Sequence, residues 1–365
     1  MRDKYMYTDR LAVGYGNKIL IDDIDINVEK GQIIALIGPN GAGKSTILKT
    51  IIGQLDSKGG TVYLAGKKMS EMSGHEVSVK MSVMMTDRLK TELMTCRDVV
   101  NTGRYPYTGR LGILSAADHE KVDEAIELVG GEDIADRDFM EISDGQRQRI
   151  MLAKAICQEP EIIVLDEPTS FLDIRHKLEL ISILKKMVKE RNIAVIMSLH
   201  EIDLAQKVAD KIVCVKGDRI DRSGEPDEIF TSDYIEKLYD IRKGSYNELF
   251  GGIELERAGG MAEVFVISGN GTGIPYYRKC QREGIPFATG IIHENDVDCQ
   301  VAEALAVEVI KEKAFNHITD ETFERAVEIM NKCKSVKCTL DVFGDINVEN
   351  KKLYEIAKST GKKIL

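Results

Sequence analysis

The segment Gly38-Pro39-Asn40-Gly41-Ala42-Gly43-Lys44-Ser45-Thr46 fits the phosphate-loop pattern G-x-x-x-x-G-K-[ST]. The apolar run at 33–37 predicts a strand buried in a parallel sheet, and residues 45–52 predict a helix. In this context the loop N–H groups would surround the α- and β-phosphates, Lys44 would reach the β- and γ-phosphates, and Ser45 would bind Mg²⁺. A glycine-rich turn with a chance lysine is the alternative, which the strand and helix on either side disfavour. The segment therefore predicts a nucleotide site.

Composition limits the remaining possibilities. The 365 residues exceed one ordinary core, and 43% of them are hydrophobic, so we expect two folded domains. The formal net charge of -10 argues against a nucleic-acid partner. The seven cysteines form no C-x-x-C pair, which indicates a reducing cytosol. We find no signal peptide and no apolar run of about 20 residues, so membrane association would require a partner.

Carboxylates and a histidine follow two further apolar runs. Residues 162–165 predict a buried strand that ends at Asp166-Glu167, and residues 193–197 predict another that leads to His200. In P-loop enzymes an acid at such a strand end holds Mg²⁺, and a neighbouring acid activates the attacking water. We therefore assign Asp166 to the metal, Glu167 to the base, and His200 to the γ-phosphate. A surface Asp-Glu turn and a structural histidine are the alternatives.

A second helix start lies at Ser143-Asp144-Gly145-Gln146. It precedes an amphipathic helix, and its N-terminus would be available for the γ-phosphate of a nucleotide held by another copy of the chain. The segment resembles the signature motif of ATP-binding cassette (ABC) proteins, and the order of motifs from Tyr15 to His200 matches that family over roughly the first 255 residues. The resemblance implies an α/β P-loop NTPase cassette with a RecA-like core, an antiparallel β subdomain and a helical subdomain.

The resemblance also implies residue roles. Tyr15 would stack on adenine, although packing is an equal alternative from the residue alone. Residues 38–46 would be the phosphate loop of an ATPase, residues 143–146 the signature, Asp173 the D-loop aspartate, and His200 the switch histidine. The active form would be a head-to-tail dimer of cassettes that binds ATP and Mg²⁺.

Three positions depart from the family pattern. Asp144 replaces the first glycine of the signature, so we expect its carboxylate to turn away from the γ-phosphate. Phe171 replaces a small residue in the D-loop. The Q-loop glutamine, a metal contact, falls on Thr86, whose shorter side chain would need a bridging water.

The segment 98–109 points to a partner. Its run Gly103-Arg104-Tyr105-Pro106 resembles the helical subdomain of importers for iron-siderophore complexes, haem and cobalamin. An exposed arginine beside tyrosines is also good interface chemistry, although a solvated loop is the alternative. We expect an importer ATPase that docks on a separate permease at the cytoplasmic face of the membrane, with a substrate-binding protein involved indirectly. A soluble ABC ATPase, such as one for iron-sulfur assembly, is the competing class.

Domain boundaries follow from the glycine-punctuated stretch at 244–260, which has no sustained periodicity and is expected to be a linker. The cassette would then span 1–243, and a smaller Rossmann-like α/β domain of unknown role would span 261–365. The loop Gly269-Asn270-Gly271-Thr272-Gly273 suggests a dinucleotide site, but Ile274 stands where that motif needs glycine. A packing or dimerisation domain is the main alternative.

Overall fold

The computed structural model describes residues 4–85, 93–109 and 112–365. The chain divides into two compact units, Met1–Phe230 and Thr231–Leu365. The division differs in place from the sequence-based boundary at 243. The expected linker at 244–260 contains the antiparallel hairpin β12 (Ser245–Asn247) and β13 (Gly252–Glu254), and this hairpin belongs to the second unit.

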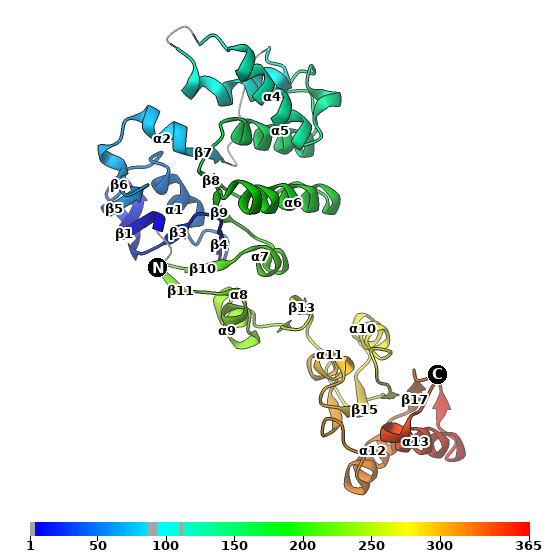
Figure 1. Cartoon of the computed structure of the whole chain (residues 1–365). Coiled ribbons are helices and arrows are strands. Elements are labelled where there is room, and N and C mark those ends of the chain that lie inside the picture. Colours follow the sequence, from blue (N-terminus) through cyan, green and yellow to red (C-terminus); the bar gives the residue numbers. More distant parts are fainter. Residues whose placement is uncertain (1–3, 86–92, 110–111) are drawn as a thin grey trace. The chain divides into compact units, whose positions relative to one another are not determined.

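A six-stranded sheet forms the centre of the first unit, in the order β11-β10-β4-β9-β8-β7 (Figure 1). The five strands β10, β4, β9, β8 and β7 are parallel to one another, and β11 forms the edge as an antiparallel hairpin with β10. Every residue of β4, β8 and β9 is buried, as their continuous apolar sequences require. The strands are β4 (Ile33–Ile37), β7 (Met81–Met84), β8 (Ile162–Leu165), β9 (Ala194–Ser198), β10 (Lys211–Lys216) and β11 (Arg219–Gly224).

A second sheet of the first unit is antiparallel, in the order β2-β1-β5-β6, with β3 paired to β1. Its strands are β1 (Lys4–Tyr15), β2 (Lys18–Ile24), β3 (Asn27–Glu29), β5 (Gly59–Leu64) and β6 (Lys67–Lys68). Apolar residues of both sheets and of α1 (Lys44–Ile51) share one buried core. The phosphate loop is thus anchored between a central strand and a packed helix.

The helical part of the first unit groups α3 (Cys96–Asn101), α4 (Ala116–Leu128) and α5 (Asp144–Cys157), which contact one another. Each has a capping box. The N-cap serine or threonine side chain accepts from the backbone N–H three residues later, and the aspartate or glutamine side chain at that later position accepts from the N-cap backbone N–H. The other α-helices of the unit are α2 (Gly74–Lys80), α6 (Ile174–Arg191), α7 (Ile202–Val208) and α8 (Pro226–Ile229). Short 3₁₀ helices cover Met69–Glu71, Thr102–Tyr107 and Glu132–Ile134.

The second unit contains α9 (Ser232–Tyr239), the β12–β13 hairpin and a five-stranded parallel sheet in the order β16-β15-β14-β17-β18. The strands are β14 (Val264–Ile267), β15 (Phe287–His293), β16 (Glu308–Glu312), β17 (Ser335–Cys338) and β18 (Lys363–Ile364). The order reverses between β14 and β17, which is the doubly wound arrangement of a Rossmann-like unit.

Two apolar clusters hold the helices of this unit on its sheet. The first includes residues of α12 (Asp320–Lys332) and α13 (Val348–Ser359), and the second includes residues of α10 (Ile274–Glu283) and α11 (Val297–Leu305). A further 3₁₀ turn covers Asp345–Asn347. A cassette-type first unit and a smaller parallel α/β unit are the predicted fold class.

Candidate functional site

Strand order brings the predicted catalytic groups together. The phosphate loop follows β4, Asp166 and Glu167 follow β8, and His200 follows β9. Strands β4, β9 and β8 are neighbours in the sheet and run parallel, so their carboxyl ends lie at one edge. Open α/β sheets bind ligands at such an edge.

Two glycines of the loop are sterically required. Gly38 has φ 145°, and a Cβ there would lie 2.0 Å from the carbonyl oxygen of Val215. Gly43 has φ 101°, and a Cβ there would lie 2.7 Å from Cδ1 of Ile21. Any side chain at either position would require a backbone conformation that L-residues avoid, and at Gly38 it would also overlap the backbone of Val215. The loop is therefore shaped by its glycines.

Lys44 is buried and folds back over the loop. Its Nζ donates to the carbonyl oxygens of Gly38 at 2.7 Å and Pro39 at 3.1 Å. Burial lowers the pKa of Lys44, while the carboxylates of Glu167 and Asp166 act in the opposite direction. The ammonium group thus lies at the loop with two carboxylates close enough to influence it.

Asp166 connects the three loops through hydroxyl groups. Its Oδ1 accepts hydrogen bonds from Ser45 Oγ at 2.9 Å and from Ser198 Oγ at 2.7 Å. Ser198 Oγ in turn accepts from the backbone N–H of Glu167 at 2.9 Å. Asp166 is 1% exposed, so its position is fixed by these bonds and by burial. Sequence reasoning gave Ser198 no role, although its place at the end of a buried strand was the available signal.

Ser45 and Asp166 supply the oxygen donors that Mg²⁺ prefers. Among the described residues, no group of three or more His, Cys, Asp or Glu side chains is arranged for a metal ion. This donor set still fits Mg²⁺ at a nucleotide, because that ion commonly takes one or two protein ligands and completes its shell with phosphate and water. Thr86, the third predicted metal residue, lies outside the described residues.

Glu167 and His200 form a pair between Oε1 and Nε2, and the other oxygen of Glu167 accepts from Ser170 Oγ at 3.1 Å. The backbone of Glu167 has φ 50°, a left-handed conformation that costs a non-glycine residue roughly 1 kcal/mol. The bond from its N–H to Ser198 holds it there. Strain of this kind gathers at sites where a side chain must point in one direction.

A cavity of about 420 Å³ lies at this edge of the sheet, and its size suits a small ligand. Its lining comprises Tyr15, Leu20, Asn40, Gly41, Ala42, Gly43, Lys44, Ser45, Thr46, Glu167 and His200. Tyr15 is 56% exposed at its rim, and its hydroxyl lies 3.1 Å from Oγ1 of Thr46. An exposed ring beside the cavity is more suitable for stacking than a packed one would be.

The signature residues are absent from this cavity lining. Ser143 caps α5, because its Oγ accepts from the Gln146 N–H at 3.3 Å while Gln146 Oε1 accepts from the Ser143 N–H at 3.0 Å. Asp144 accepts from Arg147 Nη1 at 3.0 Å. A Cβ at Gly145 would fit, in ordinary contact with the side chains of Leu172 and His176. Contacts between a signature motif and a nucleotide in this cavity would thus have to come from another copy of the chain.

The D-loop leads into α6. Asp173 caps that helix by accepting from the His176 N–H at 2.9 Å. Phe171 has φ 65° and is 76% exposed, so the bulky departure from the family pattern lies on the surface of the unit.

Arg104 is buried, not exposed as the sequence suggested. Its Nε donates to Asp118 at 2.9 Å, and its Nη1 donates to Glu159 at 2.9 Å and to the Cys157 carbonyl at 2.8 Å. Sequence reasoning missed these partners because they come from α4 and the end of α5. Tyr105 is 57% exposed and remains the accessible aromatic of the segment.

In the glycine loop at 269–273 of the second unit, backbone N–H groups donate to carboxylates of the chain itself. Asp298, which is fully buried, accepts from the N–H groups of Gly273 at 2.9 Å and Ile274 at 3.2 Å. Asp296 accepts from the N–H of Asn270 at 2.7 Å. These donors are the ones a dinucleotide phosphate would require, so the loop is used internally.

The fold and the cavity of the first unit define a P-loop NTPase. The ABC transporter family model matches residues 21–170, and a second model, the MJ0874 family, matches residues 287–365. The chain is 42% identical over 267 residues to an uncharacterized ABC transporter ATP-binding protein of Methanocaldococcus jannaschii, MJ0873, across 73% of this chain and 92% of that protein. The chain belongs to the ATP-binding proteins of ABC transporters, which are ATPases.

Two further relatives carry transport names. A probable siderophore transport system ATP-binding protein of Bacillus subtilis, YusV, is 34% identical over 245 residues, across 67% of this chain and 89% of that protein. The cobalamin import ATP-binding protein BtuD of Halobacterium salinarum is 30% identical over 314 residues, across 84% of this chain and 78% of that protein.

Solved structures show the same fold. An ATP-binding subunit of an ABC transporter superposes with a TM-score of 0.57 at 23% identity, across 67% of this chain and 98% of that one. A dimeric bacterial ABC transporter cassette, MJ0796, superposes with a TM-score of 0.55 at 24% identity, across 60% of this chain and 98% of that one.

Proposed function

We propose that the chain is the ATP-hydrolysing subunit of an importer for an iron chelate, haem or cobalamin. The observation that carries the catalytic part is the convergence of Lys44, the Ser45–Asp166 pair and the Glu167–His200 pair on one cavity. The names of the siderophore and cobalamin relatives support the transport part.

In this proposal the loop N–H groups and Lys44 bind the phosphates. Lys44 exchanges its two carbonyl partners for phosphate oxygens, which carry full negative charge and are stronger acceptors. Ser45 and Asp166 would hold Mg²⁺, which supplies charge neutralisation at the β- and γ-phosphates. Tyr15 stacks on the adenine at the rim.

Glu167 accepts a proton from the attacking water, and His200 orients the Glu167 carboxylate. The carboxylate is held on one side by Ser170 and on the other by His200, so it has a defined direction at the end of β8. Water is a poor nucleophile until a base takes its proton in the transition state, and a positioned carboxylate provides that base.

The active form in this proposal is a head-to-tail dimer. The signature at the start of α5 lies outside the chain's own cavity lining, so its serine and helix N-terminus would meet the γ-phosphate bound by another copy. A cassette among the structural neighbours is dimeric, which supports a dimer.

The importer would act through a separate permease. In the described part of the chain, no helix combines the length and apolarity required to cross a membrane. We place the protein on the cytoplasmic face of the membrane, docked through the helical part that contains the exposed Tyr105, with a substrate-binding protein involved only through the permease.

The catalytic part is tested with Glu167→Gln. Glutamine keeps the shape and can still accept from Ser170, but it cannot act as a base, so ATP turnover should fall about 10²-fold or more while ATP still binds. Steady-state phosphate release and nucleotide binding measure the two effects. Glu179→Gln, which removes an exposed carboxylate on α6, is the matched control. Unchanged turnover in Glu167→Gln would remove this residue from its role.

The transport part is tested by affinity capture of the full chain from detergent-solubilised membranes of its own host. Recovery of a multi-span permease supports the importer. Recovery of a soluble iron-sulfur assembly scaffold without a permease would instead identify the competing class of ABC ATPase.

A further inference from the structure

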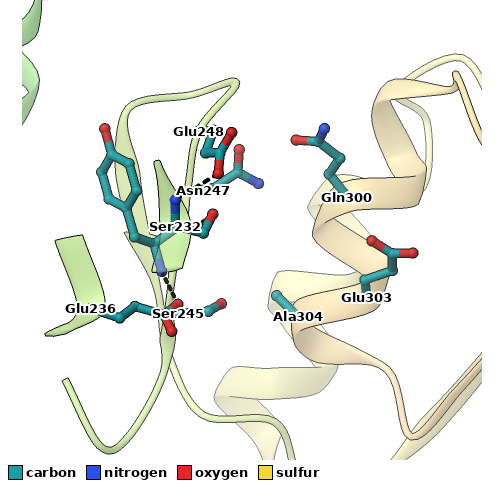
Figure 2. Close-up of a pocket in the computed structure, with 9 residues that line it drawn as sticks. Ser232, Glu236, Ser245, Asn247, Glu248, Gln300, Glu303 and Ala304 are labelled. Carbon is teal, nitrogen blue, oxygen red and sulfur yellow. Dashed lines mark hydrogen bonds between the residues drawn. The ribbon is translucent and has the colours of Figure 1, made fainter. Parts of the chain in front are cut away.

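A cavity of the second unit, about 370 Å³ in volume, is unsuited to a nucleotide. It lies between α11 on one side and the start of α9 with the β12–β13 hairpin on the other (Figure 2). The carboxylates of Glu236, Glu248 and Glu303 line it, and they would repel phosphate groups. The nucleotide chemistry therefore depends on the cavity of the first unit and on the residues that hold its lining in place.

Ser198 contacts the catalytic groups of the first unit without lining their cavity. It is the last residue of β9, it is fully buried, and it is absent from the cavity lining. Its Oγ donates to Oδ1 of Asp166 at 2.7 Å and accepts from the Glu167 N–H at 2.9 Å. One hydroxyl group thus contacts both the carboxylate assigned to the metal and the backbone of the residue assigned as the base.

The direction of these two hydrogen bonds is fixed. A backbone N–H group can only donate, and an ionised carboxylate can only accept. The Glu167 N–H therefore uses a lone pair of Ser198 Oγ, and the hydroxyl proton points to Asp166. Each bond in such a chain polarises the next, and the burial of Ser198 prevents water from replacing either bond.

Both carboxylates depend on outside support for their direction. The φ of 50° at Glu167 is an unfavourable left-handed conformation, so loss of the acceptor for its N–H would let the backbone relax and turn the side chain away. Asp166 Oδ1 also accepts from Ser45 Oγ at 2.9 Å. Two hydroxyl groups therefore hold the same carboxylate, one from the phosphate loop after β4 and one from the end of β9.

We propose that Ser198 is a positioning residue for ATP hydrolysis, whose hydroxyl group directs the Asp166 carboxylate to the metal ion and the Glu167 carboxylate to the attacking water. The inference rests on the roles proposed above for these two carboxylates. The two bonds of the hydroxyl group go to the loop after β8 and not to the phosphate loop. The hydroxyl group therefore controls turnover and the Mg²⁺ dependence of ATP binding, and ATP affinity without the metal ion is independent of it.

The test compares Ser198→Thr with Ser198→Val in the full chain. The two variants have the same shape and differ only in the hydroxyl group, so the cost of an added methyl group in a buried position cancels between them. The turnover number of Ser198→Val should be about tenfold lower than that of Ser198→Thr at an unchanged KM for ATP, because a buried hydrogen bond to a charged group is lost. Ser198→Ala, which adds no volume, should show a similar loss relative to the wild type.

Ser82→Ala is the matched control. Ser82 lies on β7, is 1% exposed, and its Oγ has no hydrogen-bond partner among the described residues. Removal of this hydroxyl group should leave turnover and the Mg²⁺ dependence unchanged.

A second measurement does not depend on turnover. In the Glu167→Gln background, which keeps the backbone N–H, ATP retention by the chain is followed with increasing Mg²⁺ and in the presence of EDTA. Ser198→Thr and Ser198→Val should retain ATP equally in EDTA. Ser198→Val should require several-fold more Mg²⁺ for half-maximal retention, because the Asp166 carboxylate has lost one of the bonds that direct it.

Equal turnover and an equal Mg²⁺ requirement in Ser198→Thr and Ser198→Val, with both chains folded by thermal unfolding, would overturn the proposal. If either of the larger residues prevents folding, unchanged values in Ser198→Ala overturn it as well. A wild-type chain without ATPase activity would instead contradict the proposed function, and the Mg²⁺ dependence of ATP retention would still decide the role of Ser198.

Discussion

Asp144 is a negative charge in a motif that should meet a phosphate. In the structure its carboxylate accepts from Arg147, one helical turn along α5. The guanidinium group also lies 5.5 Å from the centre of the Phe139 ring and is largely buried, so it is held in place. The pair offsets the charge that aspartate brings to the helix N-terminus, where only the backbone would otherwise face an anion.

The first prediction concerns this pair. Arg147→Met keeps the aliphatic stem but removes the positive charge that lies against Asp144 near the partner's γ-phosphate, so ATP turnover should fall several-fold. Asp144→Gly in the same chain removes the repulsion and should restore most of the turnover. Steady-state ATPase rates measure both effects.

Circular dichroism melts serve as the control, because the rescue must occur without a change in folding. If Asp144→Gly leaves the Arg147→Met defect unchanged, the arginine acts through its packing on Phe139 and not through the charge.

At the scale of elements, a buried ion pair joins segments of the helical part. Arg104 joins the 3₁₀ segment at 102–107 to α4 through Asp118 and to the end of α5 through Glu159. Both Arg104 and Asp118 are buried, so removing one partner leaves an uncompensated charge in a poorly solvated position.

The second prediction is that Arg104→Leu lowers the free energy of unfolding by about 3 kcal/mol, the range expected when one member of a buried pair is removed. Urea unfolding of the full chain, followed by circular dichroism, gives the change. Arg175→Leu, which breaks an exposed pair on α6, should change it by less than about 1 kcal/mol. A similar effect of the two substitutions would contradict the role of burial.

The third prediction concerns acid. Hydrogen bonds from Ser115, and then from Arg104, lower the pKa of Asp118 to about 2 from 3.8. Because the folded-state pKa is depressed, this contribution to stability is present above about pH 4 and is lost as the pH falls toward 2. Asp118→Asn should therefore be less stable than the wild type at neutral pH, and the difference should shrink below pH 4. A difference that stays constant with pH would exclude the charge as its origin.

At the scale of the whole molecule, the first unit holds the catalytic groups and the signature at separate places. The fourth prediction follows from a head-to-tail dimer. Lys44→Ala and Ser143→Arg should each abolish turnover, and a mixture of the two should regain part of it. In a mixed dimer one site combines the intact loop of one copy with the intact signature of the other.

The control gives the two variants different tags and tests, in the presence of ATP, whether one tag captures the other variant, which shows that mixed dimers form. Glu167 is left intact in both variants. If mixed dimers form and remain inactive, each chain completes its own site and the head-to-tail arrangement is wrong.

The sequence alone determined features that depend on local conformation. The glycine spacing at 38–43 predicted the loop because only glycine adopts the required φ values, and the apolar runs predicted buried strands. Ser143 is a helix cap whose effect extends over only three residues. Such features can be predicted because their energetics involve neighbours along the chain.

Tertiary structure decided what depends on residues distant in sequence. The order β4-β9-β8 brings Glu167 to His200 and gives Ser198 its place between Asp166 and the Glu167 N–H. Pairing across elements buried Arg104, and the carboxylates of Asp296 and Asp298 at the start of α11 accept from the N–H groups of the glycine turn at 269–273. A residue pattern does not specify which partners meet, because strand order and helix packing minimise the free energy of the whole core and not of a segment.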